Sequence, residues 1–186
     1  MEEHTMTDTI RIDAEVQLHI HDHEKYPEGT NPEDHYGEDS YDYSEFVPKL
    51  ILNGVESDHT INDYALVKSA AKRHVDAWII TCGCGSAGCA GIWDAIKVKV
   101  RKHTVEWRVP KNQGYGDLKS FYSFNKKDYI EAIDTFVNDV KDIVKDDPLV
   151  YDQFTHGSGG EWHLISYQLE RGHYDRTVSD PTEFYF

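Results

Sequence analysis

Residues 92–109 read IWDAIKVKVRKHTVEWRV and carry the clearest structural signal in the chain. Apolar and polar side chains alternate in IWDAIKVKV (92–100) and again in TVEWRV (104–109). Because successive side chains of a β-strand point to opposite faces of the sheet, each segment is predicted to be a strand with one buried face. Arg101 to His103 interrupt the alternation and predict the turn of a hairpin. Antiparallel pairing of this kind is typical of an α+β protein.

Downstream of this hairpin the hydrophobic period lengthens to about 3.6 residues, which indicates an amphipathic helix. We therefore predict a helix over about residues 126–146. Asn125, followed three residues later by Asp128, resembles a capping box at its start, and Asp147-Pro148 predicts its end. The apolar stripe consists of Tyr129, Ile130, Ile133, Phe136, Val137, Val140, Ile143 and Val144.

The chain upstream of the hairpin adds strands and a second helix. Residues 9–23 alternate like a long, half-buried strand, and residues 46–53 (FVPKLILN) predict another that turns at Asn53-Gly54. Apolar positions at about residues 60–77 suit a helix with Ser57 or Asp58 as its cap. Further short strands are predicted at 79–81, 162–169 and 174–178. We therefore expect a single α+β domain over residues 1–186, built mostly of antiparallel sheet.

Composition restricts the class of function. The 186 residues include 19 Lys and Arg against 34 Asp and Glu, so the formal net charge is −15. Such a charge disfavours nucleic-acid binding through a general basic surface, and binding to anionic membranes, but it attracts basic proteins. The chain has no apolar run long enough to span a bilayer and no signal-like start, so we expect a cytoplasmic protein.

Residues 81–91, TCGCGSAGCAG, contain all three cysteines of the chain. Clustered cysteines in an odd number indicate a reducing compartment. Cys82, Cys84 and Cys89 could supply three thiolates to a structural zinc ion, and His103 or His74 is the candidate fourth ligand. Reduced structural thiols and a disulfide or redox role remain open as alternatives. A phosphate-binding loop is disfavoured because a strand-like segment, not a helix, follows the glycines.

Residues 22–45 form an acidic, tyrosine-rich segment with nine Asp and Glu residues and one Lys. Carboxylates interleaved with tyrosines can pair with Lys and Arg on a partner while the aromatic rings anchor the contact. A basic protein such as a nuclease is the expected partner, and a solvated loop without a partner is the alternative. The candidate partner-binding residues are Glu33, Asp34, Tyr36, Glu38, Asp39, Tyr41, Asp42 and Tyr43.

His19, His21 and His23 stand two residues apart, so they project from the same side of the first predicted strand. Three imidazoles in this arrangement could chelate one cation. The alternative is that they lie on the solvated face of the strand, because the alternation that groups them also places them opposite the core.

Three segments, TCGCGSAGCAGIW, TVEWRV and SFNKKDYIEAI, together resemble a family of small uncharacterised bacterial proteins with a Thr-Cys-x-Cys-Gly-x3-Cys-Ala-Gly motif. The resemblance spans roughly residues 78–145. It implies an α+β layout and a role for the three cysteines, but it transfers no catalytic residue. By size and charge the chain is also similar to bacterial immunity proteins that neutralise toxins.

We therefore expect a non-enzymatic, acidic cytoplasmic binding protein, such as an immunity or inhibitor protein that neutralises a basic nuclease toxin. This hypothesis accounts for the charge, the acidic segment and the absence of a complete catalytic signature. The alternative hypothesis is a small metal-dependent hydrolase that activates water at the cysteine loop or at the His19, His21 and His23 face.

Overall fold

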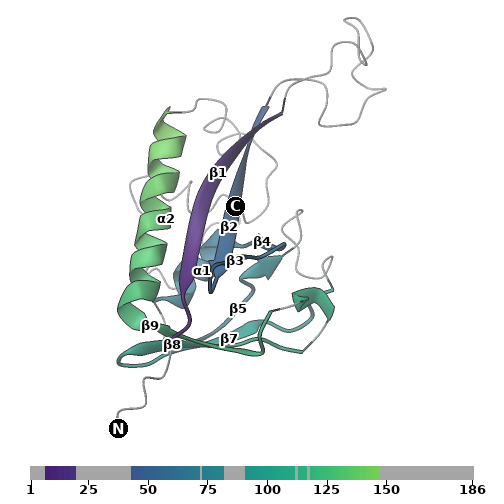
Figure 1. Ribbon diagram of the computed structural model, residues 1–186, viewed down its shortest axis with the longest axis vertical. Helices are drawn as coiled ribbons and strands as arrows, with labels where there is room; N and C mark the ends of the chain where they lie inside the picture. The colour runs from purple at the N-terminus through teal and green to yellow at the C-terminus, as the bar shows by residue number, and fades with distance from the viewer. Residues whose placement is uncertain are drawn as a thin grey trace, which may run out of the picture.

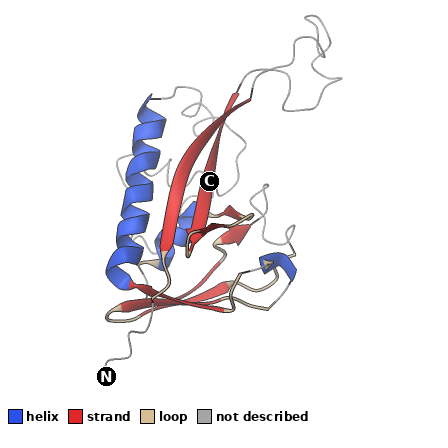
Figure 2. Cartoon of the chain, viewed as in Figure 1, coloured by secondary structure: helices blue, strands red, loops and turns tan. Residues whose placement is uncertain are grey.

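The computed structural model describes residues 7–19, 43–71, 73–81, 91–111, 113–116 and 118–146. In these residues the fold is α+β, with three antiparallel sheets and a long helix at the C-terminal end of the described part (Figure 1). Figure 2 shows a tall hairpin beside this helix, both standing over a lower sheet. The predicted fold class is confirmed. The strands predicted at 162–169 and 174–178 lie outside the described residues.

The tall hairpin consists of β1 (Ile10–His19) and β2 (Tyr43–Leu52), which pair along their whole length from Ile10↔Leu52 to His19↔Tyr43. A tight turn then leads into β3 (Val55–Glu56), where Leu52 pairs with Val55. The turn residues Asn53 (φ 54°) and Gly54 (φ 78°) both have positive φ, as a two-residue type I′ turn requires. The Asn53-Gly54 turn predicted from the sequence is thereby confirmed.

A four-stranded sheet in the order β5-β7-β8-β9 lies across the base of the hairpin (Figure 1). Its strands are β5 (His74–Ala77), β7 (Ile96–Val100), β8 (Thr104–Arg108) and β9 (Phe121–Asn125). β7 and β8 pair around the turn at residues 101–103, which confirms the predicted hairpin. The first strand begins at Ile96 instead of Ile92, because consecutive exposed residues at Trp93 and Asp94 break the alternation.

Helix α2 (Lys126–Asp146) has the predicted bounds and follows β9 directly. The Asn125 side chain caps it, since Oδ1 accepts hydrogen bonds from the backbone N–H of Lys127 (2.9 Å) and of Asp128 (3.4 Å). Its apolar stripe packs against β1, β8 and β9. The buried face of the lower sheet and the helix therefore share one hydrophobic core.

The second helix is much shorter than predicted. Helix α1 spans Asp63–Ser69, and its N-cap is Asn62, whose Oδ1 accepts the Ala65 N–H at 2.8 Å. The expected caps Ser57 and Asp58 lie before β4 (Thr60–Ile61), which pairs with β6 (Ile80–Thr81). Residues 74–77 form β5 because pairing with β7 outweighs their helix-like apolar spacing. A seven-residue helix is marginal alone and depends on this tertiary packing.

The core holds a hydrogen-bonded aromatic cluster. Trp107 of β8 meets Phe124 of β9 edge-on at 5.2 Å and Tyr129 of α2 at 6.0 Å. The buried Tyr129 hydroxyl lies 2.6 Å from Ser69 Oγ of α1 and accepts the Trp107 indole N–H at 3.1 Å. These bonds join both helices to the lower sheet.

Neither helix in the described ranges combines the length and hydrophobicity that a membrane span requires.

Candidate functional site

The cysteine loop begins after β6 of the two-stranded sheet and ends before β7 of the lower sheet. Thr81 ends β6, Gly91 precedes β7, and the three cysteines between them lie outside the described residues. His103 is exposed in the β7–β8 turn, at the end of β7 away from Gly91. His74 is exposed on β5 opposite Lys99, close to the same turn.

Zinc binding at this loop stays a prediction. Among the described residues no three His, Cys, Asp or Glu side chains are placed to hold a metal ion together. Elemental analysis and thiol titration of the purified chain separate the alternatives. One zinc per chain with three protected thiols would support the zinc site, and three reactive thiols without metal would support reduced structural cysteines.

The acidic segment begins at the far end of the tall hairpin. His19 is the last residue of β1 and Tyr43 is the first of β2. The other candidate partner-binding residues, Glu33 to Asp42, lie outside the described residues, as do His21 and His23. The structure therefore places where the acidic segment attaches, at the tip opposite the lower sheet (Figure 1).

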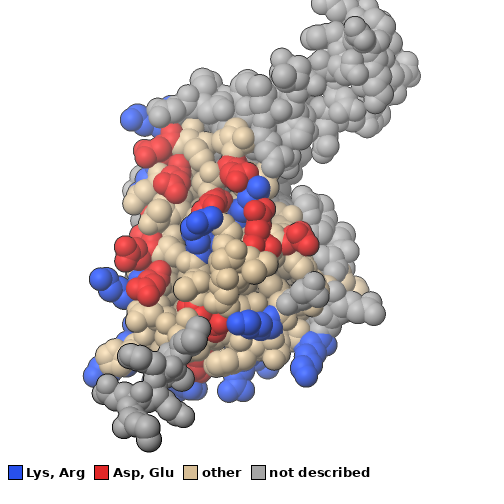
Figure 3. Space-filling view, viewed as in Figure 1, with Lys and Arg blue, Asp and Glu red and all other residues tan. Residues whose placement is uncertain are grey.

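Charge is divided unevenly along the chain. The described residues contain 16 Asp and Glu and 15 Lys and Arg, so the described body is nearly neutral. The remaining 18 acidic and 4 basic residues, and with them almost all of the −15 surplus, belong to the rest of the chain. Figure 3 shows acidic and basic side chains intermixed over the described surface in this view.

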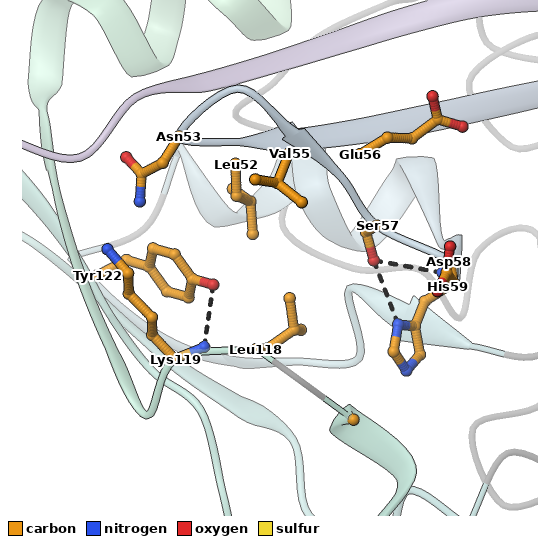
Figure 4. Close-up of a pocket in the computed structure, with 11 residues that line it drawn as sticks. Leu52, Asn53, Val55, Glu56, Ser57, Asp58, His59, Leu118, Lys119 and Tyr122 are labelled. Carbon is orange, nitrogen blue, oxygen red and sulfur yellow. Dashed lines mark hydrogen bonds between the residues drawn. The ribbon is translucent and has the colours of Figure 1, made fainter.

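The described residues form an open cleft of about 320 Å³ beside the β2–β3 turn (Figure 4). Its walls come from residues 52–53 and 55–59 on one side and from Gly116, Leu118, Lys119 and Tyr122 on the other. The polar groups of the first wall are those of Asn53, Glu56, Ser57, Asp58 and His59. The Tyr122 hydroxyl accepts the Lys119 backbone N–H at 3.0 Å and fixes the second wall.

His59 is held in one orientation. Its Nε2 lies 2.8 Å from the Gly114 carbonyl, which can only accept, so this nitrogen carries the proton of the neutral ring. Nδ1 then accepts the Ser57 hydroxyl at 3.2 Å, while the same Ser57 oxygen accepts the His59 backbone N–H at 3.3 Å. Gly116 approaches the ring so closely that a Cβ there would lie 3.3 Å from His59 Cε1.

A serine bound to a histidine resembles the first part of a nucleophile–base pair. Here, however, the two residues are neighbours in one turn, and the orienting group is a backbone carbonyl instead of a carboxylate. The two Ser57–His59 hydrogen bonds close a serine turn of the kind that stabilises loops. We therefore assign the pair the structural role of fixing the β3–β4 connection.

Asp8 lies at the edge of the cleft and joins the two main sheets. Its Oδ2 accepts the Ser123 N–H of β9 at 2.8 Å, and its Oδ1 accepts the Asn53 side-chain amide at 2.8 Å and Lys119 Nζ at 3.1 Å. Burial raises the pKa of this carboxyl, but hydrogen bonds from Ser123, Asn53 and Lys119 outweigh burial and hold the pKa below 3.8.

No sequence pattern predicts the cleft. The apolar pattern of residues 60–77 predicts Ser57 or Asp58 as a helix cap, and no motif marks His59 or Asp8. The Asn53-Gly54 dipeptide is the one local sequence signal for part of the cleft, because it predicts the turn beside the first wall. The opposite wall is contributed by residues more than 55 positions away.

No family model matches the sequence, and no curated protein or solved structure shows significant similarity to it.

Proposed function

We propose that this chain is a non-enzymatic, cytoplasmic binding protein whose acidic segment engages a basic partner protein, in the manner of an immunity or inhibitor protein. The observation that carries the proposal is the separation of charge: a nearly neutral described body holds a strongly acidic remainder. Carboxylates gathered in this way give a strong local field for a cationic surface, such as that of a nuclease.

Two features of the described residues support binding over catalysis: the open cleft and the long β1–β2 hairpin. The cleft beside the β2–β3 turn is open, and the Ser57–His59 pair in that cleft closes a turn. The tall, fully paired β1–β2 hairpin provides a rigid base at which the acidic segment attaches. A segment mounted on a rigid element loses less entropy on binding than a free chain does.

The test compares two variants that each lose four negative charges. The first carries Glu33→Gln, Asp34→Asn, Glu38→Gln and Asp39→Asn. The matched control carries four changes at exposed positions of α2: Asp128→Asn, Glu131→Gln, Asp139→Asn and Asp142→Asn. Calorimetric titration against a panel of basic nuclease domains, together with inhibition of their nuclease activity, measures the effect at low and high salt.

We expect a partner to bind the parent chain one to one, to bind the α2 control almost as well, and to lose at least tenfold in affinity for the first variant. Affinity should also fall as salt rises, because screened charges attract less. The proposal is wrong if no basic domain distinguishes the parent from the first variant, or if binding is equally strong at low and high salt.

A further inference from the structure

The four-stranded sheet has one face that no other described element covers. Val98, Trp107 and Tyr122 point into the core. Because side chains alternate along a strand, the residues next to each of them in sequence point to the opposite face. One row across this open face contains Asp76, Lys97, Arg108 and Phe121, which are register partners on the four neighbouring strands. With strands about 4.8 Å apart, the row is about 14 Å wide.

Basic side chains dominate this open face. Lys97, Lys99 and Arg108 make no ion pair with any described residue. Of the two carboxylates on the face, Glu106 already binds Arg101 at 3.1 Å, and only Asp76 opposes the three cations. Figure 3 shows Lys and Arg side chains gathered along the lower edge of the molecule, where β7–β9 lie in Figure 1.

Exposed aromatic rings accompany these cations. Phe121 lies on the open face of β9 and is 47% exposed. Trp78 follows β5, continues its alternation of exposed side chains and is 40% exposed. Trp93 precedes β7 and is 74% exposed. Among the side chains whose exposure the structure describes, these are the three exposed large aromatic residues, and all belong to this sheet or its flanks.

The two longest acidic segments attach far from the cationic face. The acidic segment attaches at the tip of a ten-residue hairpin, about 30 Å from the lower sheet at the usual rise per residue. Residues 147–186 follow α2, whose 21 residues also rise about 30 Å away from β9. Both attachment points therefore lie well beyond the distance of about 8–10 Å over which charges act at physiological salt.

We propose that the open face of the β5-β7-β8-β9 sheet is a binding site for single-stranded nucleic acid. The cations, which pair with no carboxylate of the described residues, would contact phosphates, and the exposed aromatic rings would stack on unpaired bases. An acidic polypeptide would satisfy the cations but would leave the rings without stacking partners, so the combination favours a nucleic acid. The 14 Å width suits two or three nucleotides.

The test is fluorescence anisotropy of a labelled oligothymidylate of about 12 nucleotides, titrated with the full chain at several salt concentrations. The logarithm of affinity should fall with the logarithm of salt with a slope of about −2, as expected for about three phosphates. Fluorescence of the exposed tryptophans, Trp78 and Trp93, should be quenched on binding.

Three variants separate charge from stacking. Lys97→Ala with Arg108→Ala should weaken binding at least tenfold and reduce the slope to about −0.7. Phe121→Ala should weaken binding about tenfold with the slope unchanged. The control, Lys127→Ala with Lys145→Ala on exposed positions of α2, removes two positive charges elsewhere and should change affinity less than twofold.

Several results would overturn the proposal. One is the absence of oligonucleotide binding at low salt, and another is equal weakening by the control pair. Equal affinity for duplex DNA with no effect of Phe121→Ala would show a simple polyanion surface. A synthetic peptide with the sequence of residues 22–42 that bound the face more tightly than the oligonucleotide, with the same dependence on Lys97 and Arg108, would identify an acidic polypeptide as the occupant instead.

Discussion

The Tyr129 hydroxyl completes a buried chain of hydrogen bonds. Because Ser69 Oγ donates to the Leu66 carbonyl, Tyr129 must donate to Ser69, and it accepts from the Trp107 indole. Tyr129→Phe therefore leaves the Trp107 N–H buried without a partner and should cost about 1–3 kcal/mol of unfolding free energy in urea denaturation. Ser69→Ala keeps the Trp107–Tyr129 bond but leaves the buried Tyr129 O–H without its acceptor, so it should cost a similar amount. Equal stability of Tyr129→Phe and the parent would contradict this account.

Ionisation of the buried Tyr115 hydroxyl should destabilise the fold at alkaline pH. Burial, together with the nearby Asp94 carboxylate, raises the pKa of its hydroxyl to about 12, and this hydroxyl donates to the Asp94 carbonyl at 2.6 Å. Because the folded pKa lies above the unfolded value of about 10, the contribution is complete below pH 10 and is lost as pH rises through 12. Urea denaturation from pH 9 to about 11.5 should show a steeper loss for the parent than for Tyr115→Phe. Parallel curves would contradict the assignment.

A Gly→Ala substitution should destabilise the protein to different extents at two glycines with positive φ. At Gly54 (φ 78°) an added Cβ meets no atom within 4 Å, so Gly54→Ala should cost only the backbone strain, about 1 kcal/mol. Gly54→Asn should recover most of it, because Asn tolerates this conformation. Gly116→Ala adds a 3.3 Å approach to His59 and should cost more. Thermal denaturation of the three variants tests this order, and equal losses at both glycines would refute it.

Elements with strong local signals were predictable from the sequence. Helix α2 follows a continuous apolar stripe with a cap at Asn125, and the β7–β8 hairpin follows strict alternation. The region predicted as a helix over about 60–77 was only partly right, since partners distant in sequence convert residues 74–77 into β5. The cleft and the Asp8 contacts depend on residue pairs 45 to 115 positions apart, for which no local pattern exists.

At the scale of the whole molecule, the cationic face and the attachment point of the acidic segment lie far apart. The open face of the lower sheet presents cations that pair with no described carboxylate, and the acidic segment attaches about 30 Å away at the tip of the tall hairpin. This distance is several times the screening length at physiological salt, so the attachment point lies outside the range over which the cations of the sheet act. The distance between the tip and the lower sheet depends on the contacts that connect the hairpin to that sheet.

Asp8 makes that connection, since it binds the β2–β3 turn through Asn53 and β9 through the Ser123 N–H, next to the Asp8–Phe124 bridge. Asp8→Asn should lower the unfolding free energy by about 1–3 kcal/mol at neutral pH, because charge-assisted bonds are lost. The folded pKa lies below 3.8, so the parent's advantage is complete above the unfolded pKa and is lost as pH falls through the folded value. Urea denaturation at pH 7, 5, 4 and 3 should therefore show the two proteins converging in acid. A difference that stayed constant down to pH 3 would mean that the Asp8 charge does not hold the two sheets together.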